Sequence, residues 1–232
     1  VIAMDTDSVY ITFDDLVSQV FPEGTDKNKI CDFLNTIGQE KVEQVLAQGY
    51  DELADYTNAF QNKMEMGREI IADRGIWTAK KRYILNVYDN EGVRYETPKL
   101  KMMGIETAKS STPQWVRGKL TEAFKTVMNG TEEELWDFVE YTRKDFRNLP
   151  VEDMSSPRGC NNLKQYSNTT TIYSKGTPIH VRGALLYNNE LKKKNLDKRY
   201  EVVKNSDKIR FTYLTVPNPL NENVISYINT LP

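Results

Sequence analysis

The polar quartet Asp5 to Ser8 (DTDS) is the first group of residues in the chain that could carry out chemistry. It lies between two short β-prone segments, 1–4 and 9–13, and this pattern predicts a β-hairpin with two carboxylates at its tip. Carboxylates on a rigid turn are hard oxygen ligands of the kind that Mg²⁺ prefers. Phosphoryl transfer with two metal ions uses such ligands, although an ordinary acidic turn has the same composition.

A basic run, Lys80 to Tyr83 (KKRY), leads into the apolar segment 84–88. Cations beside an aromatic residue on a strand suit contacts with the phosphates and the minor-groove edge of a nucleic-acid duplex. The run is therefore a candidate DNA contact. A solvated strand end is the alternative interpretation.

The first half of the chain must position both groups. Thr25-Asp26 is a plausible N-cap, and the apolar spacing after it predicts a long helix over 27–56, or two helices with a break near Gly38. The following region then reads as strands around a turn at 89–92, which predicts an antiparallel sheet. The expected strands cover 64–72, 77–88, 93–97 and 99–103.

The second half is predicted to be mainly helical. One helix begins after Thr112, with Thr112 as N-cap and Pro113 at the first helical position. Another begins at the Thr131 capping box, and a third covers 180–187. The region 150–178 reads as irregular, with a break at Pro157 and Gly159, and the segments 200–203 and 208–216 read as a hairpin.

Composition excludes several classes of protein. The 232 residues are 39% hydrophobic and 28% charged, as in globular proteins of one or two domains. No apolar run approaches the roughly 18 residues of a membrane helix. With Cys31, Cys160 and a single histidine, His180, the chain cannot form a four-thiolate or multi-histidine zinc site. A Ser-His-Asp triad lacks any accompanying nucleophile-elbow pattern.

The net charge of −2 averages over unlike segments. Residues 1–70 hold 5 basic and 14 acidic side chains (−9), and residues 71–119 hold 10 and 5 (+5). Residues 120–160 hold 5 and 9 (−4), and residues 161–232 hold 11 and 5 (+6). The two basic segments are candidates for a polyanion-binding surface, and solvated faces of differing sign are the alternative.

The quartet Asp5 to Ser8 and the run Lys80 to Tyr83 occur in this order, roughly 70 residues apart. In this combination the sequence resembles family B DNA polymerases, specifically the replicative polymerases of T-even-type phages. The quartet at Asp5 resembles the palm motif YGDTDS, and the run at Lys80 resembles the KKRY motif. Further similar stretches are 80–87 (KKRYILNV), 98–113 (PKLKMMGIETAKSSTP) and 180–187 (HVRGALLY). The resemblance extends from residue 1 to about residue 219.

This resemblance implies an α+β fold. Residues 1–106 would form an antiparallel palm sheet with a long helix, and residues 107–232 a mainly helical thumb with a small β-hairpin. It also implies a fragment, because the fingers and the palm strand with the other metal-binding aspartate have no counterpart. We therefore expect the chain to be inactive alone. Two alternatives stay open: a subunit of a split polymerase that assembles in trans, and a non-catalytic duplex-DNA-binding module.

The resemblance also implies roles for single residues. Asp7 would bind both Mg²⁺ ions, Asp5 would support it, and Glu69 would lie near the metal site. The implied DNA contacts are Lys81 and Tyr83 in the minor groove near the primer end, Lys80 and Arg82 at phosphates or in support of the sheet, and Ser110, Ser111, Thr112, His180 and Arg182 on the thumb surface. A histidine that is hydrogen-bonded to the backbone is the alternative for His180.

The implied partners are primer–template DNA, a dNTP, the N-terminal portion of the polymerase and, for the intact enzyme, a sliding clamp. The implied location is the cytoplasm of a phage-infected bacterium, with neither secretion nor a membrane. The chain departs from the family at three places. Ala3-Met4 replaces Tyr-Gly, Gly67 replaces an acid of the phage branch, and the loop before Trp77 is short.

Overall fold

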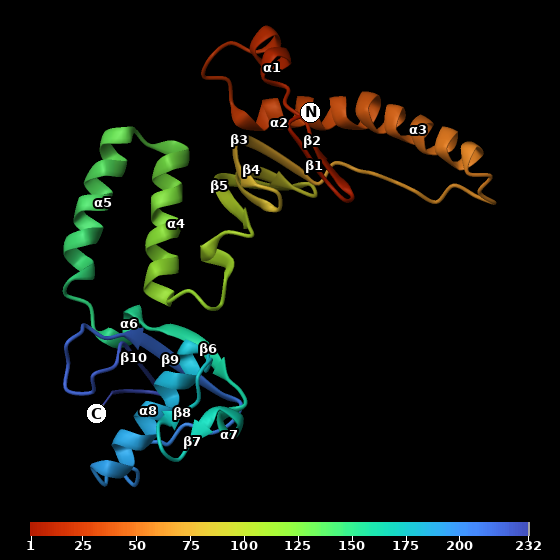
Figure 1. Ribbon diagram of the computed structural model, residues 1–232. Helices are drawn as coiled ribbons and strands as arrows, with labels where there is room; N and C mark the ends of the chain where they lie inside the picture. Colours follow the sequence, from red (N-terminus) through yellow and green to blue (C-terminus); the bar gives the residue numbers. More distant parts are fainter. Residues whose placement is uncertain (232) are drawn as a thin grey trace. The chain divides into compact units, whose positions relative to one another are not determined.

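The computed structural model describes residues 1–231 and divides the chain into two compact units, Val1–Ile105 and a second that begins at Glu106 (Figure 1). Helices and antiparallel sheets occur in both units, which confirms the predicted α+β class. The assignment of the units as palm and thumb stays a prediction. No helix in the described part of the chain is long and apolar enough to cross a membrane.

The first unit begins with the predicted hairpin. Strands β1 (Ala3–Asp5) and β2 (Ser8–Tyr10) pair antiparallel, and Asp5 lies opposite Ser8. The two-residue turn has Thr6 in the left-handed region, at φ 54°. A short helix α1 (Asp14–Val20) follows, which the sequence patterns did not predict.

The predicted long helix is broken where glycine was expected to break it. Helix α2 (Lys27–Ile37) is capped by the Asp26 side chain, which accepts a hydrogen bond from the Asn28 N–H (3.1 Å). A π-helical turn, η1 (Gly38–Val42), then leads into α3 (Glu43–Tyr56). Such turns widen the hydrogen-bond ladder by one residue and are frequent at functional sites.

A three-stranded antiparallel sheet forms the rest of this unit, in the order β3-β4-β5. Its central strand carries the buried side chains Ile84, Leu85, Asn86 and Val87. The strands are β3 (Ile70–Ala79), β4 (Arg82–Asn90) and β5 (Val93–Met103).

The predicted strand boundaries need three corrections. Residues 64–69 belong to no strand, the expected strand 77–88 is interrupted by a turn at 80–81, and residues 93–103 form one strand instead of two. Lys80 and Lys81 are not typical turn residues, so neither composition nor side-chain periodicity located the turn that they form. Strand pairing decides the boundaries instead.

The second unit contains the predicted helices with one different cap. Its main helices are α4 (Gln114–Asn129), α5 (Glu132–Phe146) and α8 (Ile179–Lys193), with shorter η2 (Glu106–Ala108), α6 (Val151–Met154) and α7 (Leu163–Tyr166). The capping box of Thr131 and Glu134 is present. Thr112 is not the N-cap of α4: Pro113 occupies that position, and the Thr112 N–H donates to the Lys109 carbonyl (3.1 Å).

The predicted hairpin of 200–203 with 208–216 is wrong. Residues 200–203 form no strand, because the Asn188 side chain satisfies both backbone groups of Val203 (2.8 and 2.9 Å). The strand at 207–213 is instead the middle of a three-stranded sheet, β10-β9-β6. Its strands are β6 (Ser156–Cys160), β9 (Asp207–Tyr213) and β10 (Val224–Tyr227), and β7 (Ser167–Asn168) pairs with β8 (Ile172–Tyr173).

The region 150–178 is therefore less irregular than predicted. Pro157 and Gly159 lie inside β6 and do not break the chain. This is possible because β6 is an edge strand, where a residue without an N–H is tolerated.

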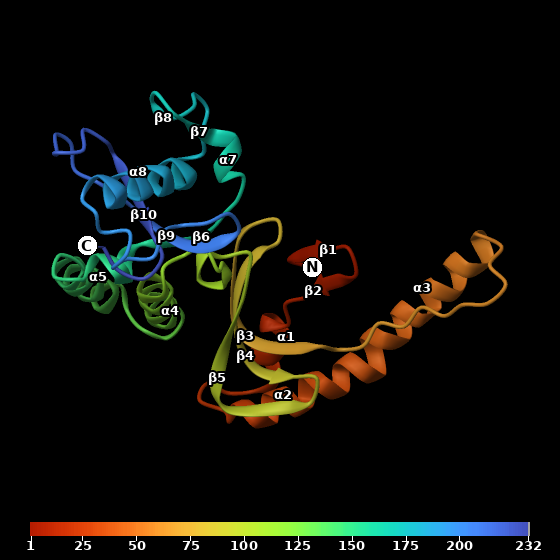
Figure 2. The same cartoon turned by 90° about the horizontal axis from the view of Figure 1, so that it is seen from below.

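Helix α8 packs on β10 to form the main core of the second unit, as both views of the ribbon show (Figures 1 and 2). Val181, Ala184, Tyr187 and Leu191 on the helix are buried against Tyr227. Gly183 allows this close approach, since a β-carbon there would lie 2.5 Å from Ser226 Oγ and 2.8 Å from the Ser226 backbone nitrogen.

Two glycine-to-alanine variants test this packing. Gly183→Ala should lower the free energy of unfolding of the second unit by about 1–3 kcal/mol, because helix and strand must move apart. Gly118→Ala is the matched control in α4, where nothing lies within 4 Å of the added β-carbon. It should stabilise the unit by up to about 1 kcal/mol through helix propensity. Urea unfolding followed by circular dichroism measures both, and equal effects would contradict the packing argument.

Candidate metal and DNA site

The carboxylates of the hairpin tip are held by local hydrogen bonds. The Asp7 N–H donates to the Asp5 carbonyl (2.7 Å), the Thr6 hydroxyl donates to Asp5 Oδ1 (3.1 Å), and the Ser8 hydroxyl donates to the Asp5 carbonyl (3.1 Å). Asp5 is half-buried, whereas Asp7 is exposed. The two acids therefore differ: Asp5 is engaged by the protein, and Asp7 is presented to solvent.

The basic run comes from the turn that connects β3 to β4. Lys80 and Lys81 form this turn, with Lys81 in the left-handed region at φ 61°. Gly104 packs against the Lys81 carbonyl, at φ +64°, and a β-carbon there would collide with that oxygen. Lys81 Nζ lies 3.8 Å from Asp5 Oδ1, so the structure brings the two sequence motifs into contact.

An aromatic cluster supports this contact. Tyr10 of β2 packs edge-on against Trp77 (centroids 5.3 Å apart) and lies beside Tyr83 (5.5 Å). Burial raises the pKa of Tyr83, and the hydrogen bond with Tyr10 raises it further. A raised pKa of this origin means that the protonated Tyr83 hydroxyl donates its hydrogen bond to Tyr10.

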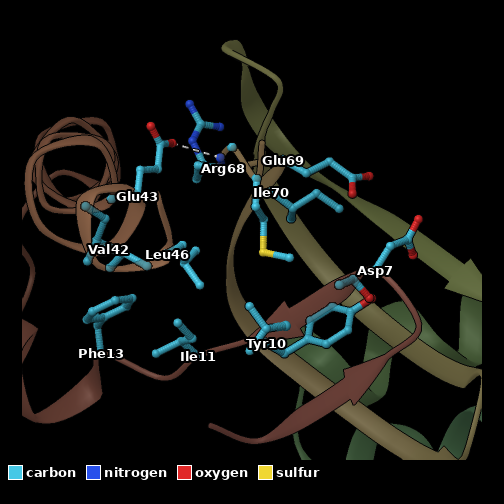
Figure 3. A pocket seen from close by; sticks show the side chains of 16 residues that line it. Asp7, Tyr10, Ile11, Phe13, Val42, Glu43, Leu46, Arg68, Glu69 and Ile70 are labelled. Carbon is cyan, nitrogen blue, oxygen red and sulfur yellow. Dashed lines mark hydrogen bonds between the residues drawn. The ribbon is translucent and has the colours of Figure 1, made fainter. Parts of the chain in front are cut away.

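Glu69 and Asp7 line one cavity of about 200 Å³ in the first unit. Figure 3 shows the two carboxylates on the same side of this cavity, with apolar side chains such as Phe13 and Leu46 on the other side. Glu69 also forms an ion pair with Lys101 of β5 (2.5 Å). Two of the three candidate metal ligands therefore pair with a lysine: Asp5 with Lys81 and Glu69 with Lys101. No ion pair of Asp7 is described within residues 1–231.

The position of Glu69 depends on a buried ion-pair network around Asp89. Asp89 is 1% exposed, and its carboxylate accepts hydrogen bonds from Arg68, from Arg94 Nε (3.1 Å) and from the Gly92 N–H (3.0 Å). Burial alone would raise the pKa of Asp89. The hydrogen bonds from Arg68, Gly92 and Arg94 outweigh this effect and lower the pKa below its usual value.

The same arginines reach the helical layer of the unit. Arg68 donates through Nη2 to Asn35 Oδ1 (2.6 Å) on α2, and its backbone N–H donates to Glu43 Oε1 (3.1 Å), the bond drawn in Figure 3. Arg94 Nη2 pairs with Asp32 Oδ1 (2.8 Å). Glu69 follows Arg68 directly, so this network fixes the point from which Glu69 reaches the cavity.

The candidate metal ligands do not form a complete site. Among residues 1–231, no group of three or more His, Cys, Asp or Glu side chains could hold a metal ion. Asp7 and Glu69 nevertheless fit Mg²⁺ in their chemistry, because this ion binds through one or two carboxylates and keeps water or phosphate oxygens as other ligands. By their chemistry, the two carboxylates fit part of a Mg²⁺ ligand set.

The remaining candidate DNA contacts lie in the second unit. Ser110 is exposed and Ser111 and Thr112 are half-buried, in the segment before α4. His180 lies in the first turn of α8, where burial, and then Arg158, lower its pKa. His180 is therefore neutral at physiological pH.

Arg182 has protein partners of its own. It donates to Asn223 Oδ1, and its guanidinium lies 5.6 Å from the ring centroid of Tyr173. A phosphate contact would have to share the guanidinium with these groups.

Sequence reasoning missed Tyr10, Trp77, Arg68 and Lys101. Tyr10 and Trp77 lie in segments that were recognised as strand-forming, but their contact joins residues 67 positions apart. Arg68 and Lys101 were visible only as charges. No local sequence pattern indicates that Arg68 pairs with Asp89 or that Lys101 pairs with Glu69.

Comparison with known proteins places the chain. No protein-family model matches it. It is 36% identical over 232 residues to the DNA-directed DNA polymerase of Escherichia phage RB69, and 35% identical over 194 residues to that of Enterobacteria phage T4. The chain belongs to the family of these phage DNA polymerases. The matches cover 96% and 80% of the chain but 25% and 22% of the relatives, so it spans about a quarter of a phage polymerase.

The buried network of this polymerase chain can be tested through pH. Asp89→Asn should lower the free energy of unfolding near neutral pH by about 3 kcal/mol, the lower end of the range for breaking a buried pair, because both arginines stay partly exposed. The folded-state pKa of Asp89 lies below the usual 3.8, so its stabilisation is complete above that pH and is lost as the pH falls through the folded-state pKa.

The difference between the unchanged chain and Asp89→Asn should therefore shrink below about pH 4. Urea unfolding at pH 7, 5 and 3 measures it. Asp137→Asn, at an exposed position of α5, is the control and should have little effect at any pH. A difference that does not change with pH would contradict the role of the charged Asp89.

Proposed function

We propose that this chain is the part of a family B DNA-directed DNA polymerase that contains the final palm strands and the thumb. The observation that carries the proposal is the contact between the two motifs, in which Lys81 Nζ lies 3.8 Å from Asp5 Oδ1. A metal-binding acid hairpin and a DNA-binding basic turn have to meet at the primer end, where nucleotide addition takes place. The 36% identity to a phage polymerase supports the same activity for the intact protein.

In this proposal the three acids Asp5, Asp7 and Glu69 have different roles. Asp7, exposed at the hairpin tip, holds Mg²⁺ together with Glu69, which lies on the same side of the cavity, and Asp5 stays paired with Lys81 and fixes the hairpin. When bound, the metal ions lower the pKa of the attacking 3′-hydroxyl and stabilise charge on the transferred phosphate. The second palm aspartate comes from outside this chain.

The duplex is bound by both units in this proposal. Lys81 donates hydrogen bonds to acceptors in the minor groove, whose base edges offer mainly acceptors, and the Tyr83 hydroxyl donates there when it turns from Tyr10 to the DNA. Lys80 and Arg82 contact phosphates. Neutral His180, Arg182 and the hydroxyls of Ser110, Ser111 and Thr112 contact the duplex from the second unit.

The remaining partners follow from the proposed reaction. The intact enzyme takes a dNTP and primer–template DNA, contains an N-terminal portion supplied by the same chain or in trans, and works with a sliding clamp. As part of a phage replicative enzyme it acts in the cytoplasm of the host bacterium.

The first test is DNA binding by the 232-residue chain. Lys81→Ala should weaken binding to a primer–template duplex by about fivefold to tenfold and lower the slope of log K against log salt by about 1. Fluorescence anisotropy at several salt concentrations measures both values. Lys41→Ala, at an exposed position of η1, removes the same charge elsewhere and should change little.

Removal of the acids Asp5 and Asp7 should not weaken DNA binding, in contrast to removal of Lys81. The double variant Asp5→Asn with Asp7→Asn should bind DNA as tightly as the unchanged chain or more tightly, because two negative charges near the phosphates are removed. Equal losses for Lys81→Ala and Lys41→Ala, or binding that is independent of salt, would contradict the proposed DNA site.

The second test is catalysis. The isolated chain should not extend a labelled primer in the presence of Mg²⁺ and dNTPs, because its carboxylates form no complete metal site in the described residues. Gel analysis of primer length is the measurement. Extension that disappears in the Asp7→Asn variant would show that the chain is sufficient for catalysis and would overturn this part of the proposal.

A further inference from the structure

Helix α3 exposes an apolar face. Val42 at the end of η1 and Val45, Leu46, Leu53 and Tyr56 of α3 are related by spacings of three, four, seven and eleven residues and therefore lie on one side of the helix. Nevertheless, no residue of α3 is buried. The exposed part of this face, here called the α3 stripe, consists of Val45 (71% exposed), Leu53 (46%) and Tyr56 (88%).

The two ends of this face differ. Val42 and Leu46 are half-buried and line the cavity of Figure 3, where Ile11 and Phe13 cover them. The later part of α3 and the segment after it run side by side away from the sheet of the same unit, as Figures 1 and 2 both show. The segment is tied to the polar side of the helix by the bond from Asn62 to Asp51 (2.7 Å), so it leaves the stripe uncovered.

Charge indicates what could cover the stripe. Helix α3 contains Glu43, Asp51, Glu52 and Asp55 and neither lysine nor arginine. Two copies of the chain meeting through this helix would bring like charges together, which disfavours a homodimer. An apolar face bordered by acids fits a partner helix whose apolar side chains are bordered by Lys and Arg.

We propose that the α3 stripe is the docking site for a segment of the polymerase polypeptide outside these 232 residues, with an apolar face and basic borders. The proposal rests on the proposed function. The chain spans only 25% and 22% of the length of its relatives, so most of such a polymerase lies outside it. A folded enzyme buries the apolar face of an amphipathic helix, and within this chain that face is open.

Cysteine labelling tests the proposal directly. Val45→Cys and Tyr56→Cys place a thiol on the stripe, and Gln44→Cys places one on the exposed polar side of the same helix as the control. The native thiols do not interfere, because Cys31 and Cys160 are 3% and 0% exposed and burial raises the pKa of both. Reaction with a maleimide is followed by mass spectrometry.

Each variant is labelled in two settings. One is the 232-residue chain alone, and the other is the RB69 polymerase in which these residues replace the aligned portion. The two stripe positions should react at least about tenfold more slowly in the grafted polymerase, while Gln44→Cys reacts equally fast in both. Equal rates in both settings at the stripe would overturn the proposal, and so would protection of all three positions alike.

If the grafted polymerase does not extend primers, its fold is in doubt and another setting replaces it. The 232-residue chain is then labelled in a mixture with the rest of the RB69 polymerase, supplied as a separate polypeptide. Unchanged stripe labelling there also overturns the proposal. Protection that appears in the chain alone as its concentration rises would identify a second copy as the occupant and overturn it as well.

This outcome is separable from that of the proposed function. Salt-dependent DNA binding that needs Lys81, together with an unprotected stripe, would leave the polymerase assignment intact and remove the docking site. Protection of the stripe without any DNA binding would do the opposite.

Discussion

The buried carboxylate of Asp89 is the constraint on which the first unit depends. A charge that is 1% exposed is tolerated only with full pairing, and Arg68 and Arg94 provide that pairing. Because both arginines also bind α2 residues, the pairing fixes the helical layer against the sheet. It also fixes Glu69, which follows Arg68 and faces the cavity. The position of Glu69, a candidate metal ligand, thus follows from the pairing of the buried Asp89 charge.

The meeting of the two motifs has a second, steric requirement. Lys81 reaches Asp5 from a turn whose backbone is left-handed, and only a glycine at position 104 leaves room for the Lys81 carbonyl. The aromatic contacts of Tyr10 with Trp77 and Tyr83 then hold β2 against β3 and β4. Charge attraction brings the basic turn toward the acidic hairpin, and this packing fixes the distance between Lys81 Nζ and Asp5 Oδ1 at 3.8 Å.

Local patterns predicted the local features. The DTDS hairpin, the break near Gly38, the Thr131 capping box and helix α8 each depend on residues a few positions apart, and all four are present. Strand partners and the cap of α4 were mispredicted. Asn188 satisfies the backbone of Val203 from 15 residues away, and the Arg68–Asp89 pair spans 21, so only the folded chain decides them.

Charge connects the candidate site with the open helix face. Residues 1–105 hold 12 Lys and Arg against 18 Asp and Glu, a net charge of −6, although Lys81 and Lys101 already pair with Asp5 and Glu69. An excess of this size repels itself within one compact unit. A divalent cation at Asp7 and a basic-bordered segment on α3 would each relieve part of that repulsion. Both proposed ligands would thus act on the same excess of negative charge in the first unit.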